Sequence, residues 1–319
     1  MKLVVLERNS VGTDVDVSCF ERFGEVEYYP NTVAENTAER VKDADVIIAN
    51  KAPMNENTLK DAPNVKLICL FATGFDNVDL AYCKSRGIKV ANVVNYSTSA
   101  VVQHTLLLAL SLEEKLVHYD NYVKSGEYGA QDRFSNFDRP FREFEGKTWG
   151  IVGMGNIGRG VAKVAQALGC KVIFYSASGK STCTEYERVE FDALLAQSDI
   201  LSLHCPLSDR TRGLINKEAF SKMKESAILV NVARGPVVDT QALYEALTQG
   251  QIAAAGLDVL EKEPISRDNP LNEIKDSTKL IITPHLAWAS TEARMRLVDE
   301  VAKNIQAFLD GEDRNIVNK

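Results

Sequence analysis

Short apolar runs alternate with segments of helical spacing along the first third of the chain. Uninterrupted apolar runs are typical of strands buried on both faces of a parallel sheet, with crossover helices between them. Four such runs predict strands at residues 3–6, 46–49, 66–71 and 89–93. Helical spacing predicts crossover segments at residues 33–42 and 78–86. Residues 1 to about 98 therefore form one predicted α/β unit.

The pattern changes after residue 98, where Ser97 and Thr98 offer an N-cap. The apolar positions that follow predict one long, largely buried helix from about residue 100 to 123. The next segment, residues 125–147, is too rich in aromatic side chains for a disordered linker. It is interpreted either as a packed surface loop or as an arm buried against a second subunit.

The alternation restarts at Thr148 and predicts strands at residues 148–153, 171–175, 199–204, 227–232, 253–259 and 280–283. Helices are predicted between several of them, at residues 156–168, 191–196 and 240–249. A last helix, about residues 291–309, allows the chain to return to the first unit. The predicted fold class is α/β, with two doubly wound parallel-sheet domains at residues 1–98 plus 292–319 and at residues 99–291.

A glycine motif, Gly153-Met154-Gly155-Asn156-Ile157-Gly158, lies between the first strand and the first helix of the second domain. In this strand–turn–helix context the motif indicates a dinucleotide site. Gly153 permits the turn, Gly155 lets the backbone approach a pyrophosphate, and Gly158 lets the helix pack on the strand. The helix N-terminus then presents free N–H groups and a positive dipole end to the phosphates.

Composition narrows the class of protein. The formal net charge of −7 over 319 residues gives no reason to expect nucleic acid or an anionic membrane as a partner. The six cysteines form no CxxC pair, and this favours a reduced, cytoplasmic protein. The apolar run at the N-terminus is too short for a signal peptide, and no stretch approaches the ~18 apolar residues of a membrane span.

Three polar residues each come shortly after an apolar run: Arg234, Glu263 and His285. Because ligands bind outside the carboxyl ends of the strands in open α/β sheets, we expect these side chains to converge on one crevice. The set suits hydride transfer to a 2-keto acid. His285 would supply the proton, Glu263 would favour its charged form, and Arg234 would bind a carboxylate.

The chain resembles the D-isomer-specific 2-hydroxyacid dehydrogenases over nearly its whole length. The resemblance rests on the glycine motif, His204-Cys205-Pro206-Leu207, Asn231-Val232-Ala233-Arg234-Gly235, the segment from Asp258 to Pro264, and Pro284-His285-Leu286-Ala287-Trp288. Within that family, the Ala72-Thr73-Gly74-Phe75-Asp76 turn and the ending His285-Leu286-Ala287-Trp288-Ala289 look most like glycerate dehydrogenase (hydroxypyruvate reductase) members.

The resemblance implies a flavodoxin-like substrate domain, a Rossmann cofactor domain, a cleft between them that closes over the ligands, and a homodimer formed through the cofactor domains. It implies His285 as acid/base, Glu263 as its partner, and Arg234 on the substrate carboxylate and carbonyl. Backbone N–H groups of Thr73 and Gly74 would hold the carboxylate from the other domain. Asp258 would bind the nicotinamide carboxamide. Further cofactor contacts are expected at Gly153, Gly155, Asn156, Ile157, Gly158, His204, Pro206, Thr211, Val232 and Ala233.

Sites that prefer NAD usually carry an aspartate or glutamate about 20 residues beyond the glycine turn. This chain has no carboxylate at that position. Ser176 stands there, followed by Ser178 and Lys180. The missing carboxylate removes repulsion against a 2′-phosphate, and Lys180 with the two hydroxyls would attract one. We therefore expect NAD(H) or NADP(H) as cofactor, with NADP(H) at least accepted.

Alternatives remain open at this point. Taken singly, His285, Arg234, Glu263, Asp258 and the Thr73-Gly74 turn also fit ordinary turn, cap or surface roles. Lys51 fits a substrate contact or a solvated lysine, and His104 and His118 are interpreted as structural or exposed.

The leading functional hypothesis is reduction of hydroxypyruvate, glyoxylate or pyruvate. Its alternatives are a D-lactate dehydrogenase-like enzyme for pyruvate or bulkier 2-keto acids, and a nucleotide-sensing, corepressor-like binding protein.

Overall fold

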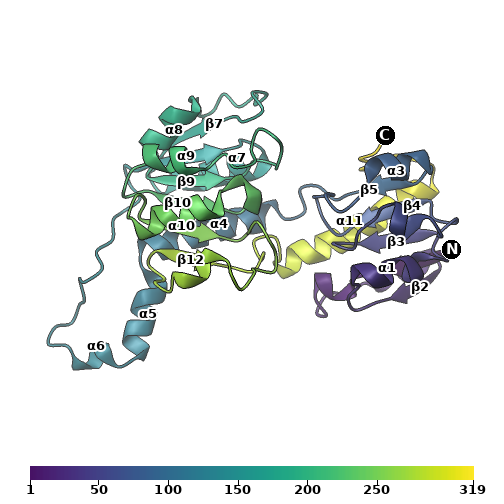
Figure 1. Ribbon diagram of the computed structural model, residues 1–319, viewed down its shortest axis with the longest axis horizontal. Helices are drawn as coiled ribbons and strands as arrows, with labels where there is room; N and C mark the ends of the chain where they lie inside the picture. Colours follow the sequence, from purple (N-terminus) through teal and green to yellow (C-terminus); the bar gives the residue numbers. More distant parts are fainter. The chain divides into compact units, whose positions relative to one another are not determined.

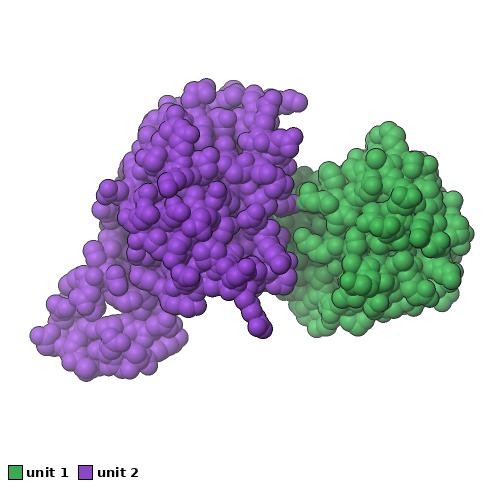
Figure 2. Space-filling view, viewed as in Figure 1, with its two compact units in different colours: residues 1–97, 288–319 green, residues 98–287 purple.

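The computed structural model describes all 319 residues of the chain. The chain divides into two compact units (Figure 2): Met1–Ser97 with Trp288–Lys319 forms unit 1, and Thr98–Ala287 forms unit 2. Unit 1 is discontinuous in sequence, because the C-terminal segment completes it. No helix of either unit combines the length and the apolar character that crossing a membrane requires.

Unit 1 is built on a five-stranded sheet in which every neighbouring pair is parallel. The strand order is β2-β1-β3-β4-β5, the flavodoxin-like doubly wound order. Figure 1 labels four of these strands, β2, β3, β4 and β5. The strands are β1 Lys2–Val5, β2 Glu25–Tyr28, β3 Val46–Ala49, β4 Leu67–Leu70 and β5 Lys89–Ala91. β3 and β4 are buried throughout, as central parallel strands require. The edge strand β2 escaped prediction because Glu25 and Glu27 interrupt its apolar pattern.

The helices of unit 1 are α1 Ala34–Val41, α2 Glu56–Leu59, α3 Leu80–Ser85 and α11 Thr291–Leu309, with 3-10 turns at Arg8–Val11 and Ser18–Phe23. The last helix has the predicted bounds. Ser290 caps its N-terminus by accepting a hydrogen bond from the Ala293 N–H, and serine is one of the residues preferred at this position. α11 packs on unit 1 with a buried face that includes Leu297, Val301 and Ile305.

Unit 2 carries a seven-stranded, fully parallel sheet in the order β12-β11-β10-β9-β6-β7-β8. The strands are β6 Thr148–Val152, β7 Lys171–Tyr175, β8 Glu187–Arg188, β9 Ile200–Leu203, β10 Ile228–Asn231, β11 Ala254–Leu257 and β12 Leu280–Ile282. The six strands β6 to β11 lie in the Rossmann order, and the strand order reverses between β6 and β9. The predicted fold class is confirmed.

The helices of unit 2 are α4 Thr98–Glu113, α5 Leu116–Lys124, α6 Glu127–Ala130, α7 Asn156–Ala167, α8 Phe191–Gln197, α9 Lys217–Lys222 and α10 Thr240–Thr248, with 3-10 turns at Gly235–Val237 and Pro270–Glu273. α4 packs against α7 and the sheet. The contact is close, because a Cβ on Gly160 would lie 2.5 Å from the Val102 side chain.

The prediction of one continuous helix from residue 100 to 123 is wrong. α4 ends at Glu113, and Lys115 takes a left-handed conformation with φ 54° before α5 begins. The charged run Glu113-Glu114-Lys115 interrupts the apolar pattern here, and the Lys115 ammonium donates to the carbonyl of Leu112. No residue of α5 is buried, so packing does not hold the two helices in line.

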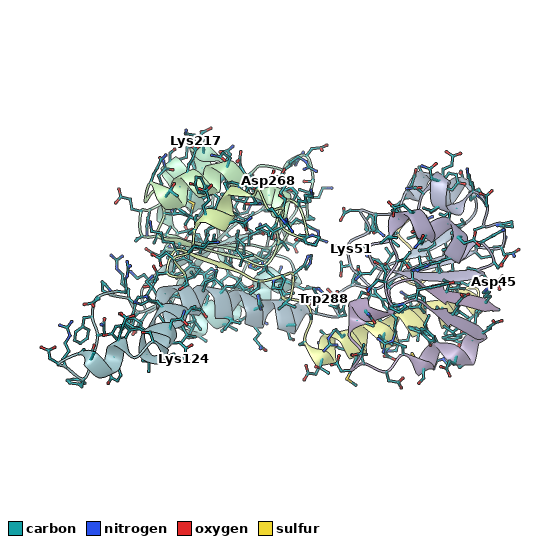
Figure 3. The ribbon with its side chains drawn as sticks, turned by 60° about the horizontal axis from the view of Figure 1, so that its bottom comes forward. Asp45, Lys51, Lys124, Lys217, Asp268 and Trp288 are labelled. Atoms are coloured by element: carbon teal, nitrogen blue, oxygen red, sulfur yellow. The ribbon has the colours of Figure 1, made fainter.

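The aromatic segment after α5 is not packed into unit 2 as a surface loop. α5, α6 and the chain that follows stand away from the sheet (Figure 1), and Figure 3 marks Lys124 at the end of α5. Phe134 is 90% and Phe137 is 73% exposed. The later part of the segment is tied back, since the Tyr119 hydroxyl donates to the Arg139 carbonyl and the Arg142 N–H donates to Glu113 of α4. At its end Phe144 is buried against Trp149 in an edge-to-face contact.

Candidate active site

The glycine turn has the geometry that a dinucleotide site needs. Gly153 has φ 95°, and a Cβ on it would lie 2.9 Å from the backbone of His204 and Cys205. A Cβ on Gly158 would lie 2.2 Å from the carbonyl oxygen of Gly153, so this glycine permits the close helix–strand contact. A Cβ on Gly155 would meet nothing within 4 Å. The turn at the start of α7 therefore leaves open backbone where a pyrophosphate would lie, and its residues fit the cofactor.

The loop after β7 carries the predicted hydroxyls and lysine. Ser176 is buried, and its Oγ accepts from the Ser181 N–H at 3.3 Å. The Ser178 Oγ accepts from the Lys180 N–H at 3.2 Å, and both residues are exposed. Ser176 therefore stabilises the conformation of the loop, whereas the side chains of Ser178 and Lys180 are exposed to solvent.

The structure also brings Arg188 to this loop, a cation that the sequence analysis did not predict there. Arg188 lies on the edge strand β8, paired with Phe174 of β7, and its guanidinium donates to the Gly179 carbonyl at 3.3 Å. Nearby carboxylates pair with other cations, Glu185 with Arg159 and Glu187 with Lys171. A strand of two residues leaves no readable pattern, so only the fold could bring Arg188 to this position.

His285 and Glu263 are in direct contact on the loops that follow β12 and β11. The His285 Nδ1 lies 2.6 Å from the Glu263 Oε2, and each side chain is about one third exposed, at 30% and 32%. The other carboxylate oxygen of Glu263 accepts from the Leu260 N–H at 2.9 Å. The Leu260 N–H fixes one oxygen of Glu263, and the other oxygen binds Nδ1 of His285. The Nε2 of His285 is therefore the ring nitrogen that can face a substrate.

Arg234 is half-buried on the loop that follows β10. Its guanidinium donates to the carbonyl of Ala233 at 2.8 Å, and its own carbonyl accepts from the Asn231 amide at 3.0 Å. The next residue, Gly235, approaches the backbone of Leu260 so closely that a Cβ would lie 1.9 Å from the Leu260 carbonyl carbon. Leu260 in turn donates to Glu263, so the loop of Arg234 packs against the loop that positions the His285–Glu263 pair.

Asp258, at the tip of β11, is 1% exposed and surrounded by donors. It accepts from the Thr283 hydroxyl at 2.6 Å and from the amides of Leu286 and Ala287 at 2.7 and 2.8 Å. Burial raises the pKa of this carboxyl, but hydrogen bonds from His104, Thr283 and the two amides outweigh it and leave the pKa below its ordinary value. Asp258 is thus an ionised anchor for the turn after the predicted acid/base. Its contact with a nicotinamide stays a prediction.

The remaining predicted cofactor residues lie on two loops. Burial lowers the pKa of His204 to about 3, and its Nε2 bonds the Ser202 hydroxyl at 3.0 Å, so the imidazole is neutral and unsuited to proton transfer. The Thr211 hydroxyl donates to the carbonyl of Pro206 at 2.7 Å, which closes the loop after β9. Val232 is half-buried and Ala233 buried on the loop after β10.

Unit 1 presents two loops at the ends of its central strands. The amides of Asn50, Lys51 and Ala52 donate to the Glu7 carboxylate at 2.6–3.1 Å, which fixes the loop of Lys51 after β3 (Figure 3).

The second of these loops, after β4, carries the Thr73-Gly74 turn. The Thr73 hydroxyl donates to the Val93 carbonyl at 2.6 Å, and the Thr73 carbonyl accepts from the Asn92 amide at 2.8 Å. The backbone N–H groups of Thr73 and Gly74 donate to no protein acceptor. Their contact with a substrate carboxylate, which the resemblance implies, stays a prediction.

Comparisons with known proteins agree with this geometry. The sequence profile of "D-isomer specific 2-hydroxyacid dehydrogenase, NAD binding domain" matches residues 106–287. The chain is 41% identical to a hydroxypyruvate reductase of Blautia hydrogenotrophica, covering 100% of both chains. It is 40% identical to a glycerate dehydrogenase of Methylorubrum extorquens, covering 99% of this chain and 98% of the relative. A D-lactate dehydrogenase of Aquifex aeolicus, solved with NAD and lactic acid, superposes with a TM-score of 0.85 at 31% identity, covering 98% of this chain and 96% of that one.

Proposed function

The chain belongs to the D-isomer specific 2-hydroxyacid dehydrogenase family, and on this premise we propose that it reduces a small 2-keto acid to the D-2-hydroxy acid. We propose hydroxypyruvate as the first substrate to test, followed by glyoxylate and pyruvate, with the reverse oxidation as the second direction. The observation that carries the proposal is the 2.6 Å contact between the His285 Nδ1 and the Glu263 carboxylate, beside the loop of Arg234.

The residues divide the chemistry as follows. When bound, the reduced nicotinamide supplies a hydride to the carbonyl carbon. His285 donates the proton that the carbonyl oxygen then needs, and Nε2 is the donor because Glu263 holds Nδ1. Glu263 fixes the orientation of the ring and stabilises its positive charge. Arg234, which stays charged, offers two parallel N–H groups to the substrate carboxylate.

We propose that NADPH is accepted alongside NADH. The loop after β7 has no carboxylate to repel a 2′-phosphate, and the exposed Lys180 and Arg188 lie on the same loop or bonded to it. Backbone contacts to the pyrophosphate come from the open turn around Gly155 and the start of α7.

We propose that a second copy of the chain covers the segment that begins with α5. Large apolar side chains are exposed on both α4 and this segment: Leu107, Leu110, Leu116, Val117, Val123, Phe134, Phe137 and Phe141. Exposed apolar side chains in such number are typical of a subunit interface.

A panel of 2-keto acids, each assayed with NADH and with NADPH, tests the proposed activity. We expect hydroxypyruvate or glyoxylate to give the highest kcat/KM. Fast turnover confined to pyruvate and bulkier keto acids would favour the second candidate, a D-lactate dehydrogenase-like enzyme, which the likeness to the Aquifex structure supports. Cofactor binding without turnover of any keto acid would instead point to a nucleotide-sensing protein and contradict the proposal.

A further inference from the structure

His104 lies on α4 and contacts the tips of two strands of unit 2. Its Nε2 is 2.9 Å from the Thr283 Oγ1 and 3.4 Å from the Asp258 Oδ1. The His104 side chain is only 13% exposed, so these contacts are shielded from water. The sequence offered no sign of this, because 179 residues separate His104 from Thr283.

The direction of the hydrogen bonds follows from proton counting. The Thr283 hydroxyl carries one proton and lies 2.6 Å from the Asp258 carboxylate, which is ionised and only accepts. Thr283 therefore donates to Asp258, and its oxygen accepts from His104. This requires a hydrogen on the Nε2 of His104 and defines a chain of donors from His104 through Thr283 to Asp258.

Asp258, which the Thr283 hydroxyl orients, is hydrogen-bonded to the turn that carries His285. Its side chain accepts from the amides of Leu286 and Ala287, and its backbone carbonyl accepts from the His285 amide at 3.0 Å. His285 itself has φ 56°, in the left-handed region that residues other than glycine rarely adopt. Such a backbone persists only where its surroundings hold it, and Asp258 supplies three of those contacts.

We propose that His104 is a positioning residue for the acid/base His285. Its Nε2–H orients the Thr283–Asp258 pair, and this pair holds the strained turn from which the His285 ring reaches Glu263. The inference rests on the proposed function for its kinetic consequence, whereas its structural consequence is independent of any substrate.

Nitrogen NMR of the ¹⁵N-histidine-labelled, full-length protein tests the structural consequence. The chain has four histidines, so single substitutions assign every ring. We expect His104 to carry hydrogen on Nε2. We also expect His104→Leu to shift the His285 ring signals, while Gln103→Leu, an exposed neighbour on α4, leaves them in place. A His104 ring without hydrogen on Nε2, or His285 signals unchanged by His104→Leu, would overturn the inference.

Kinetics with the best keto acid of the panel tests the catalytic consequence. We expect His104→Leu to lower kcat about ten- to hundredfold with KM for the keto acid within about twofold, since a misplaced ring slows the chemistry more than it weakens carboxylate binding. His104→Gln, which keeps an N–H donor, should restore most of kcat. Equal kcat values for the leucine and glutamine variants would contradict the role. An inactive wild type would reject the proposed function instead, and the NMR result would still decide on His104.

Discussion

At the scale of single residues, Glu263 acts on the proposed reaction only through the imidazole that it holds. Glu263→Gln keeps the shape of the side chain and a hydrogen-bonding group for Nδ1 but removes the negative charge. We expect kcat to fall about ten- to hundredfold, because the protonated ring loses its counter-charge. KM should change much less, since Arg234 binds the substrate carboxylate. Steady-state kinetics at several pH values measures both.

Glu261→Gln is the matched control for this prediction. Glu261 is exposed and two residues away, and its side chain accepts a hydrogen bond from the Thr240 hydroxyl at 3.4 Å. Its variant should keep wild-type kcat. A Glu263→Gln enzyme as fast as the Glu261→Gln enzyme would show that the carboxylate has no part in catalysis.

His204 gives a prediction about stability and pH. The folded state lowers the pKa of His204 to about 3, while an unfolded histidine has a pKa of about 6.5. The unfolded chain therefore binds more protons between these values, and stability falls as the pH drops through this window. Between about pH 7 and pH 5 we expect the free energy of unfolding of the wild type to fall by about 1–2 kcal/mol more than that of His204→Asn. Urea denaturation at both pH values checks this, and equal losses would contradict a neutral His204.

The three catalytic residues that the sequence predicted share one property. Arg234, Glu263 and His285 come just after apolar runs, so the rule for strand ends could place them. Glu7 and His104 could not be found in this way. Glu7 bonds amides up to 45 residues away and His104 bonds Thr283, and in both cases only the folded chain brings the partners together.

At the scale of elements, the glycine turn separates a packing role from a binding role. Gly158→Ala would place a Cβ 2.2 Å from the Gly153 carbonyl oxygen, and we expect it to lower the free energy of unfolding by about 1–3 kcal/mol. Gly155→Ala meets no atom within 4 Å and should stay within about 0.5 kcal/mol of the wild type. Its methyl group would instead weaken cofactor binding. Denaturation and cofactor titration of both variants measure the two effects, and equal stability losses would contradict this division.

The edge strand β8 gives a second prediction at this scale, because its register with β7 brings Arg188 to the predicted phosphate loop. Arg188→Ser should weaken NADPH binding about three- to tenfold and leave NADH binding nearly unchanged, since an exposed charge-assisted contact is lost. Lys217→Ser, which removes an exposed cation on α9, should change neither affinity. Parallel loss of both cofactors in the Arg188 variant would argue for a general effect on the loop.

Elements were predictable where apolar spacing was long and clear, as for α11 and the central strands. The break at Lys115 was not, because apolar positions resume in α5 after the charged run Glu113-Glu114-Lys115, although no residue of α5 is buried. β2 and β8 are short edge strands with charged side chains: Val26 and Tyr28 alternate with glutamates in β2, and β8 has no apolar residue, so neither forms an apolar run.

At the scale of the whole molecule, the exposed aromatic segment after α5 predicts a dimer. Light scattering of the wild-type protein should give twice the mass of the chain. Phe134→Asp combined with Phe137→Asp should shift it toward the monomer, because both side chains lose the apolar cover of a partner. Leu309→Asp, a charge at an exposed apolar position of unit 1, should leave the dimer intact. A wild type that stays monomeric at micromolar concentration would contradict the predicted interface.

The order of apolar runs was enough to predict two parallel-sheet units, because crossover connections of parallel strands obey few topological rules. The cleft between the units and the identity of the keto acid depend on packing that apolar spacing does not encode, and both stay predictions.

The central claim is that His285, held by Glu263, delivers the proton during keto-acid reduction. Pre-steady-state oxidation of the bound reduced cofactor by hydroxypyruvate tests it most directly, in the wild type and in His285→Gln with cofactor affinity measured in both. We expect the rate of the chemical step to fall at least a hundredfold in the variant while the cofactor still binds. A variant that oxidises the cofactor at the wild-type rate would contradict the account.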